Sequence, residues 1–518
     1  MGIPEEIRAV ERPKNTIVVA NKTDGPRKYA VRERIGVRYV PGGNPQPING
    51  DVIGYIYDGA YIPISDMPGK EGPDFRSYGA AMLAKSVSDD YLKDLMAVMD
   101  IDYAVTAYCA ALLKCIKPGL KSKRMSTEYR RTFVGEWHPG VDLNKNAMTK
   151  LYTDIGMDRG VRTKFVEKRL KRVTEGHHLI IDGMLKQDTS IVNNLSGYSS
   201  KGRVKGIRNI SLVYAYDLET MDIVCSEVFP GGYIDASAYA SFIRDNNITE
   251  GILVTDKGFP PSKLSDELAE RPKLHFLTPL KRNDTRIRDN NMMEFDGILS
   301  DTDPEILYRK VRIKGGKYLY SFRDPKKASI EEIAYLSRTR KSGEFDFESY
   351  NSKSEDFGTI VFLSDTDITP EQAYAIYSDR WLIELVFRFF KNDMDIETTD
   401  AQDDFAIIGE EFVNTIAAGI TCRMMKVLRE SGLLGEMSYG DILDDLSGVW
   451  RDTKAPKGMP KRDDRYWIHP FEYAMDEMVI LGFAQGKVKT EGMIRMLKSK
   501  GLPVPGLRSV GRPPKNAS

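Results

Sequence analysis

The chain has 518 residues, of which 41% are hydrophobic and 29% charged, and this composition excludes a disordered or low-complexity protein. Its length predicts more than one structural unit, since a single hydrophobic core stops growing well below this size, and no uninterrupted apolar run approaches the roughly 18 to 20 residues of a membrane span. The 75 lysines and arginines balance the 75 aspartates and glutamates, but residues 485–518 alone carry eight basic residues against one acidic residue, and such a tail favours a DNA-binding protein.

The N-terminal region is predicted to be rich in β-structure. Its first 15 residues lack the apolar stretch of a signal peptide, and four scattered cysteines exclude a disulfide framework, so we expect a cytoplasmic protein without a membrane partner. Between residues 15 and 65, short β-forming segments alternate with turn dipeptides such as Asn49-Gly50 and Asp58-Gly59. We therefore predict a β-rich region over residues 1–85.

Helical patterns follow from about Ser86 to Val173. They are broken at Pro118-Gly119 and at Pro139-Gly140, and the segment 163–172 is strongly basic. From the position and the basic content of this region, we predict a helical DNA-binding region over residues 86–175.

A regular pattern of strands and helices begins after residue 176. Three strands, a helix and a further strand are predicted over residues 177–182, 210–219, 222–229, 236–245 and 252–256. This order fits a mixed sheet with a crossover unit, so we predict an α/β domain that begins with residues 176–281.

Residues 282–358 interrupt this domain. They are charged, and they contain a predicted hairpin from Tyr308 to Asp324 among long polar connectors. Since an apolar strand resumes at Ile360, we predict a β-rich insertion, after which the α/β domain continues over residues 359–450. Residues 451–518 are predicted to form a helical, basic C-terminal region, and the whole chain is of the α/β multi-domain class.

A helix with one narrow polar stripe is predicted to begin near Thr369. Thr369 is suited to cap it, with Pro370 at the first helical position and Gln372 three residues after the cap. At 100° per residue, large apolar side chains fill most of the circumference, and four polar residues lie within an arc of about 60°, bordered by a fifth. The four are Tyr377, Arg380, Glu384 and Lys391, and the fifth is Arg388.

This stripe has two interpretations. A helix that is buried on most sides places its only charges in a cleft, and one carboxylate among cations is what a site for phosphate and metal requires. The alternative is an ordinary salt bridge between Arg380 and Glu384 on a solvent-facing side of the helix.

The spacing of the four residues resembles a family signature. Tyr377-x2-Arg380-x3-Glu384-x6-Lys391 matches the Y-x2-R-x3-E-x6-K pattern of insertion-sequence DDE transposases and resembles the group known as YREK or "IS-four". The resemblance covers roughly residues 120–430. It implies an RNase H-like catalytic core, with a β-rich insertion between its second and third carboxylates.

That family requires two aspartates on neighbouring strands of the core. Asp182 ends an apolar strand, and Asp256 ends another and precedes Lys257-Gly258-Phe259, which resembles the family's D-[RK]-G-F segment. The alternative for each is an aspartate that only closes a strand as a turn residue. The resemblance implies that Asp182, Asp256 and Glu384 are the catalytic carboxylates and bind two Mg²⁺ ions, for which Mn²⁺ can substitute.

The resemblance also implies the reaction and the partners. A cut-and-paste transposase binds the terminal inverted repeats of its element in double-stranded DNA, pairs two ends as a homodimer, cleaves them and transfers them into target DNA. Related enzymes form a DNA hairpin at the element end, where an aromatic side chain stacks on a displaced base. All four tryptophans lie outside the insertion, so the candidates are Tyr308, Tyr318, Tyr320, Phe322 and Tyr335.

DNA contacts are expected in three parts of the chain. The resemblance implies phosphate contacts by side chains near the catalytic carboxylates, namely Tyr377, Arg380, Lys391, Arg388 and Lys257. A basic loop after the first strand offers Lys201, Arg203, Lys205 and Arg208, for which a solvated loop is the alternative. Near the C-terminus, Gly511-Arg512-Pro513 resembles an AT-hook, which lies in the minor groove.

Two other functions stay open at this point. A metal-dependent nuclease of the same RNase H-like fold would cleave DNA without joining it, and a catalytically inactive copy would only bind DNA. Zinc is disfavoured because the five histidines form no ligand spacing with any cysteine, and the adjacent His177 and His178 are interpreted as structural. The acidic stretch from Asp393 to Glu411 is interpreted as a solvated helix face. We expect the protein in the cytoplasm of a prokaryote, at the nucleoid when it is bound to DNA.

Overall fold

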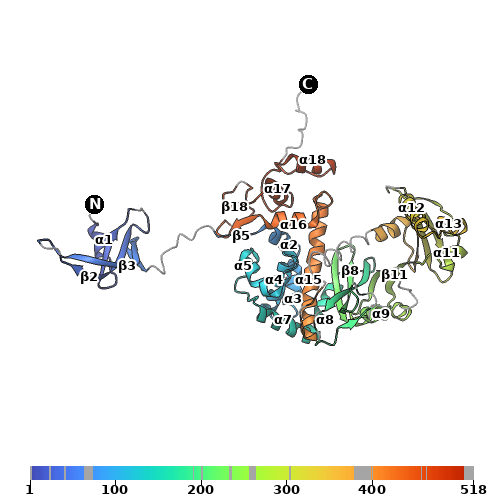
Figure 1. The fold of residues 1–518 in the computed structure, drawn as a ribbon, viewed down its shortest axis with the longest axis horizontal. Helices are drawn as coiled ribbons and strands as arrows, with labels where there is room; N and C mark the ends of the chain where they lie inside the picture. The colour runs from blue at the N-terminus through green and yellow to red at the C-terminus, as the bar shows by residue number, and fades with distance from the viewer. Residues whose placement is uncertain are drawn as a thin grey trace, which may run out of the picture. The chain divides into compact units, whose positions relative to one another are not determined.

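The computed structural model describes residues 3–506 except 23–24, 40–41, 64–73, 189, 191, 200–201, 203, 233–235, 256–263, 301, 303–304, 379–397, 400, 457 and 463. The chain divides into two compact units, Met1–Asp74 and Phe75–Ser518. The second unit combines helices with a large sheet (Figure 1), and this mixed content agrees with the predicted α/β multi-domain class.

The first unit is a small antiparallel sheet with one short helix. Its strands pair in the order β1-β2-β3-β4, and Val18, Val31 and Ile56 form its buried core. The elements are α1 (Glu5–Ala9), β1 (Thr16–Ala20), β2 (Tyr29–Arg38), β3 (Gln46–Tyr57) and β4 (Ala60–Pro63).

Two turns predicted for this sheet have different outcomes. The turn at Asp58-Gly59 is confirmed, because both residues have positive φ, 49° and 75°, and join β3 to β4 as a two-residue hairpin loop. The turn at Asn49-Gly50 is wrong, since both residues lie inside β3. There the register with β2 shifts, and a Cβ on Gly50 would lie 2.8 Å from Cγ2 of Ile35. This glycine allows a close, irregular strand pairing instead of a turn.

Helices form the first part of the second unit. The predicted helical pattern and its breaks are confirmed, since α4 ends before Pro118-Gly119 and α6 ends before Pro139-Gly140. The elements are β5 (Phe75–Ser77), α2 (Gly79–Ser86), α3 (Asp89–Met96), α4 (Ile101–Ile116), the 3₁₀ helix η1 (Ser122–Arg124), α5 (Met125–Arg131), α6 (Val134–Trp137), α7 (Lys145–Met157) and α8 (Arg159–Leu170).

An 11-stranded sheet follows. Its central strands have the order β9-β8-β6-β10-β11, in which β8 is antiparallel to β6 and β9, whereas β10 is parallel to β6 and β11. The predicted succession of three strands, a helix and a strand is confirmed. The elements are β6 (His178–Asp188), β7 (Gly197–Tyr198), β8 (Arg208–Asp217), β9 (Asp222–Phe229), α9 (Ala236–Asp245), β10 (Glu250–Val254), α10 (Ser265–Glu270) and β11 (Lys273–Pro279).

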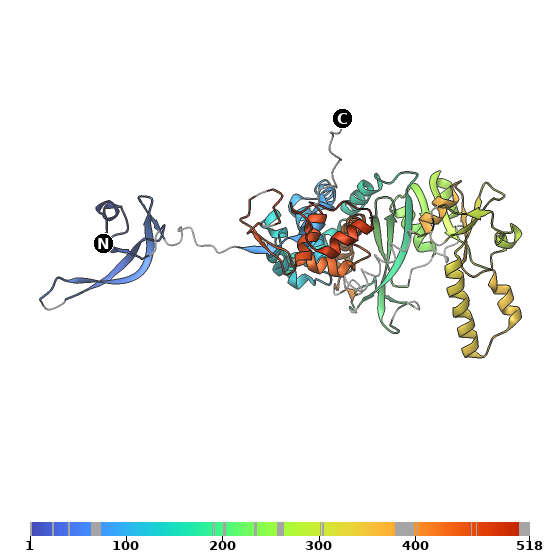
Figure 2. The ribbon, with the colours of Figure 1, turned by 90° about the horizontal axis from the view of Figure 1, so that it is seen from above.

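Residues 282–358 extend the same sheet. The predicted hairpin is confirmed as β13 (Leu307–Arg312) and β14 (Tyr318–Arg323), and β15 (Thr359–Ser364) joins β14 to β11. Where the sequence indicated polar connectors, the structure has α12 (Pro325–Ser342) and α13 (Phe347–Ser354), which stand out from the sheet (Figure 2). Only three residues of α12 are buried, so its apolar periodicity is weak. Smaller elements here are α11 (Thr285–Asp289) and β12 (Gly297–Ile298).

Helix α15 (Asp404–Glu430) runs between the helical part and the sheet (Figure 1) and packs against α4, α7 and β9. Among the described residues, only α15 is long and apolar enough to cross a membrane, but 83% of its most apolar window is buried inside the protein, as in a core helix. The later elements are α16 (Tyr439–Ser447), β17 (Trp450–Asp452), β18 (Trp467–Ile468), α17 (Glu472–Ile480) and α18 (Glu491–Ser499).

The interpretation of residues 393–411 as a solvated face is wrong at its C-terminal end. Glu411 is 1% exposed and pairs with Lys186 of β6, and Glu410 pairs with Lys114 of α4 at 3.4 Å. A carboxylate can be buried when a cation from another element neutralises it, and these two pairs tie α15 to the sheet and to α4.

Candidate active site

Asp182 lies in the middle of β6. On one edge of this strand, β8 pairs along its whole length; on the other, β10 pairs with His178–Ile180 and β16 (Thr398–Thr399) pairs with Gln187–Asp188. Within the described residues, Asp182 therefore lies opposite a gap between β10 and β16. Its half-buried carboxylate accepts a hydrogen bond from the backbone N–H of Gly183 at 2.8 Å.

The carboxylate of Asp182 points to one defined face of the sheet. Ile180 and Met184 belong to the main hydrophobic cluster, which includes α15, whereas Leu179 and Ile181 belong to the cluster on the opposite face. Because side chains alternate along a strand, Asp182 shares the face of Ile180 and Met184.

The predicted start of the signature helix is confirmed. Residues 370–378 are helical, and Thr369 and Gln372 form the expected capping box. The N–H of Thr369 donates to Oε1 of Gln372 at 2.9 Å, and the N–H of Gln372 donates to Oγ1 of Thr369 at 3.2 Å. The helix therefore begins where the sequence predicts it.

Aromatic contacts fix this helix on the face to which Asp182 points. The ring of Tyr374 lies 5.3 Å from that of Phe322, and the half-buried ring of Tyr377 lies 4.9 Å from that of Phe362, measured between centroids. Phe322 and Phe362 belong to the main cluster, which also contains Ile180. The first turns of the helix thus cover the same side of the sheet as the Asp182 carboxylate.

Nine predicted site residues lie outside the described residues. Asp256 and Lys257 follow the end of β10, and the remaining catalytic carboxylate and the signature cations follow residue 378. The nine are Asp256, Lys257, Lys201, Arg203, Arg380, Glu384, Arg388, Lys391 and Arg512.

The basic loop before β8 contributes two described cations. Lys205 is exposed. The guanidinium of Arg208, by contrast, donates to the backbone carbonyls of Asn193 at 3.1 Å and Ser196 at 2.8 Å. Arg208 therefore holds the loop together, and Lys205 is the described member of this group that faces solvent.

The five aromatic candidates of the insertion differ in how far their side chains are exposed. Tyr320, Phe322 and Tyr335 are 0%, 1% and 6% exposed, so they belong to hydrophobic clusters. Tyr308 and Tyr318 are half-buried. Only these two of the five present a ring to solvent.

Two cations of the hairpin were not predicted from the sequence. In the register of β13 with β14, Lys310 pairs with Tyr320 and Arg312 pairs with Tyr318, and Tyr320 belongs to the main cluster. Lys310 and Arg312 therefore share the face of Asp182. Lys310 donates to the carbonyl of Ile368 at 2.8 Å, just before the capping box, whereas Arg312 is exposed. The alternation of Tyr308, Lys310 and Arg312 along one strand is the signal that would have identified them.

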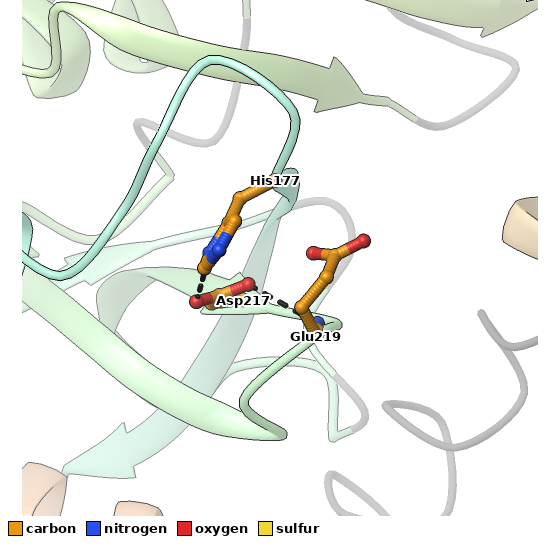
Figure 3. A group of neighbouring side chains, drawn as sticks. All are labelled: His177, Asp217 and Glu219. Atoms are coloured by element: carbon orange, nitrogen blue, oxygen red, sulfur yellow. Dashed lines mark hydrogen bonds and ion pairs between the residues drawn. The ribbon is translucent and has the colours of Figure 1, made fainter.

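A second group of potential metal ligands lies at the start of β6. His177, Asp217 and Glu219 offer ligand atoms within 4.8 Å of one another (Figure 3). Nδ1 of His177 lies 2.8 Å from Asp217, and the N–H of Glu219 donates to Asp217 at 3.1 Å. Nδ1 of His178 lies 2.5 Å from Glu219. Hydrogen bonds from His177 to Asp217 and from His178 to Glu219 thus occupy both carboxylates.

Opposite pKa shifts accompany these contacts. Burial raises the pKa of Asp217 despite hydrogen bonds from Thr220 and His177. Burial would also raise the pKa of Glu219, but hydrogen bonds from the ring and the backbone N–H of His178 outweigh it and lower that pKa to about 2. These histidines join the start of β6 to the turn after β8, which is a structural role.

Comparisons with known proteins give one match to a family. The family model described as "Transposase DDE domain" matches residues 143–410, which is more than half of the chain and includes Asp182, Asp256 and Glu384. A comparison with the curated proteins finds no match. Among solved structures, the chain is similar to "Cryo-EM structure of piggyBac transposase synaptic complex with hairpin DNA" at 12% identity and a TM-score of 0.35, with 83% of this chain and 87% of that chain covered.

Proposed function

The chain belongs to the family of transposase DDE domains, and on this premise we propose that it excises a mobile element and inserts it into target DNA by a cut-and-paste reaction. The protein is thus a transposase, and we assign it to the YREK-signature group. The catalytic carboxylates of the proposed reaction are Asp182, Asp256 and Glu384.

The observation that carries this proposal is that the Asp182 carboxylate and the helix of residues 370–378 lie on the same side of the sheet. Asp182 stands two residues after Ile180, and Asp256 stands two residues after Val254, the parallel partner of Ile180. Ile180 and Val254 share the main cluster, and in the strand that the sequence predicts over residues 252–256, alternation of side chains gives Asp256 the same side as Asp182. Glu384 follows Tyr377 by seven positions, which is about two turns of the helix predicted from the sequence, and the described part of that helix, residues 370–378, begins over that side.

The donor set fits a hard divalent cation. Members of the family generally use divalent metal ions, and the half-buried Asp182 offers the oxygen ligands that Mg²⁺ prefers. We propose that Asp182, Asp256 and Glu384 hold two Mg²⁺ ions, for which Mn²⁺ can substitute. When bound, such ions activate the attacking oxygen and stabilise the leaving oxygen.

The residues of the chain hold the DNA in register for two successive displacements. Water attacks the phosphodiester at the element end, and the bond to the 3′ oxygen breaks. The freed 3′-OH then attacks a target phosphodiester, so that one P–O bond forms while one breaks. Two copies of the chain pair the two ends as a homodimer. The proposed phosphate contacts are those of Tyr377, Arg380, Lys391, Arg388, Lys257, Lys201, Arg203 and Lys205, with Arg512 in the minor groove.

The finer part of the proposal is a DNA hairpin at the element end. The freed 3′-OH first attacks the opposite strand, whose phosphodiester breaks and releases the flanking DNA, and a second water then opens the hairpin and restores the 3′-OH that attacks target DNA. Of the two aromatic candidates with an accessible ring, Tyr318 is favoured, because the guanidinium of the exposed Arg312 lies 5.9 Å from its ring centroid. The ammonium of Lys310 lies 5.4 Å from the same centroid and is paired with Asp367. Cations beside a stacking ring can bind the phosphates of the base that stacks on it. We propose that this reaction takes place at the nucleoid, in the cytoplasm of a prokaryote.

Cleavage of a supercoiled plasmid that carries the element's own ends tests the proposal. We expect end-specific, Mg²⁺-dependent cuts by the wild type and no detectable cuts by Glu384→Gln. Glu371→Gln is the matched control, because Glu371 is an exposed carboxylate in the first turn of the helix of residues 370–378.

Each other outcome has a distinct meaning. Unchanged cleavage by Glu384→Gln contradicts the site assignment. Cleavage by the wild type without strand joining indicates a nuclease. Binding by the wild type without cleavage indicates an inactive copy.

A further inference from the structure

A lysine-lined cavity of ≈ 690 Å³ lies between the helical part of the second unit and the N-terminal half of α15. Its cations come from α4, from the segment of residues 119–123, from α7 and from β6. They are Lys114, Lys121, Lys123, Lys145 and Lys186, against the two carboxylates of Asp403 and Glu410. We call it the lysine cavity.

The deep lysines of the cavity are neutralised within the protein. Lys114 donates to Oδ1 of Asn414 at 2.6 Å and pairs with Glu410 at 3.4 Å, and Lys186 pairs with the buried Glu411. These contacts fix the side chains at the bottom of the lysine cavity. The positive charge of Lys114 and Lys186 is neutralised there, so any excess positive charge must come from the other lysines.

That excess lies at the rim. Lys123 and Lys145 are exposed, and neither has a salt-bridge partner among the described residues. Asp403, the N-cap of α15, accepts a hydrogen bond from the N–H of Phe405 at 3.2 Å and contributes one negative charge against these two lysines. The opening of the lysine cavity therefore attracts anions.

Tyr152 adds a neutral donor to the wall. Its side chain is 4% exposed, and although Ser122 lies close to it, its hydroxyl makes no hydrogen bond within the described residues. Burial raises the pKa of Tyr152 well above its usual value, so the group keeps its proton. A buried hydroxyl without a partner is unfavourable unless a ligand satisfies it.

We propose that the lysine cavity binds a phosphate group of the DNA backbone, at a site separate from the catalytic carboxylates. Lys123 and Lys145 attract the phosphate, and Tyr152 donates a hydrogen bond to it. Cavities of this size hold one small ligand, so a single nucleotide of one strand enters, and the duplex stays outside.

The position of Lys186 relates the lysine cavity to the proposed active site. Lys186 follows Asp182 by four residues on β6 and shares its face, which corresponds to about 13 Å along the strand. Along the axis of duplex DNA, where successive base pairs rise by about 3.4 Å, this length corresponds to about four base pairs. The inference that one DNA strand contacts both the lysine cavity and the catalytic carboxylates rests on the proposed function. The inference that the lysine cavity binds phosphate does not rest on it.

Equilibrium binding in EDTA, over a series of salt concentrations, tests this site with a labelled 40-base-pair duplex that carries the element end. The cavity variant is Lys123→Ala/Lys145→Ala. Its matched control is Lys93→Ala/Lys164→Ala, which removes two exposed lysines outside the cavity that likewise have no salt-bridge partner among the described residues. Tyr152→Phe removes only the hydroxyl, and thermal unfolding verifies that each variant is folded.

We expect the cavity variant to bind about tenfold more weakly, with a slope of log Kd against log[salt] reduced by about 1 for each lost phosphate contact. Tyr152→Phe is expected to weaken binding about threefold or more at an unchanged slope, because a hydroxyl carries no charge. The control variant is expected to bind like the wild type.

Equal binding by the cavity variant and its control, or wild-type binding by folded Tyr152→Phe, would overturn the site. Glu384→Gln is expected to bind like the wild type in EDTA, because the assay requires no catalysis. Loss of cleavage in Glu384→Gln together with normal binding by the cavity variants therefore rejects the lysine cavity and leaves the proposed function intact.

Discussion

Glu477 of α17 is a carboxyl group that its surroundings keep protonated. It is fully buried, neither of its oxygens has a hydrogen-bond partner among the described residues, and burial, together with Asp445 and Asp476, raises its pKa to about 9. The unfolded chain releases this proton near pH 4. The contribution of Glu477 to the free energy of unfolding is therefore fully present at low pH. It is lost as the pH rises toward 9, by up to about 1.4 kcal/mol per pH unit.

Glu477→Gln keeps the shape of the side chain but cannot ionise. We expect its Tm to exceed that of the wild type at pH 8 and to fall less between pH 6 and pH 9, as measured by scanning calorimetry. Glu491→Gln, at an exposed position of α18, serves as the control and should follow the wild type. Parallel Tm curves for Glu477→Gln and the wild type would contradict the assignment.

Arg169 belongs to the basic segment 163–172 but does not face solvent. It is 2% exposed and pairs with Asp90 at 2.8 Å, with Asp94 at 3.2 Å and with Asp222. Removal of one partner from a buried ion network leaves uncompensated charge. We therefore expect Arg169→Met to destabilise the protein by about 3–5 kcal/mol in denaturant unfolding. Lys164→Met, exposed on the same helix, should change stability little; equal stabilities of the two variants would refute the network.

Helices α7 and α15 touch through two glycines. A Cβ on Gly409 would lie 1.8 Å from the carbonyl oxygen of Tyr152, and a Cβ on Gly156 would lie 1.8 Å from that of Phe405. Gly409→Ala must separate the two helices, so we expect a loss of about 1–3 kcal/mol or more in the free energy of unfolding. Gly492→Ala, in α18 with nothing within 4 Å of its Cβ, should be neutral or stabilising by up to about 1 kcal/mol. A Gly409→Ala protein as stable as Gly492→Ala would show that the helices adjust without cost.

Sequence patterns predict elements that depend on neighbouring residues. The capping box at Thr369, the Asp58-Gly59 turn and the succession of strands from β6 to β10 are confirmed because local propensity and periodicity specify them. The Asn49-Gly50 turn is wrong because a partner strand decides its conformation.

Contacts between distant residues leave no such pattern. The partner of Glu411 is Lys186, 225 positions away, so an acidic stretch on α15 resembles a solvated face until the sheet is present. The lysine cavity likewise combines side chains of several elements, none of which forms a motif by itself. The candidate catalytic site differs, since its signature lies within a short stretch of sequence, residues 377–391, and was inferred there from the resemblance to a family pattern.

At the scale of the whole molecule, the two units have separate cores. The hydrophobic clusters of the first unit and of the second share no residue, so we expect residues 75–518 to fold without the first 74. In the first unit, β2 carries the exposed Arg34 and Arg38 and pairs with β3. A two-stranded ribbon of this kind fits the major groove of DNA.

Deletion of residues 1–74 should therefore separate cleavage from recognition. We expect the truncated protein to keep its main unfolding transition and metal-dependent nicking of plasmid DNA, because Asp182, Asp256 and Glu384 all remain. Its ratio of affinities for element ends and for random DNA should fall toward one, as measured by competition binding. Full-length Arg34→Ala/Arg38→Ala should show the same loss of preference while retaining its fold, since both side chains are exposed. An unchanged affinity ratio in the truncated protein would assign end recognition to the helical region of residues 86–175 instead.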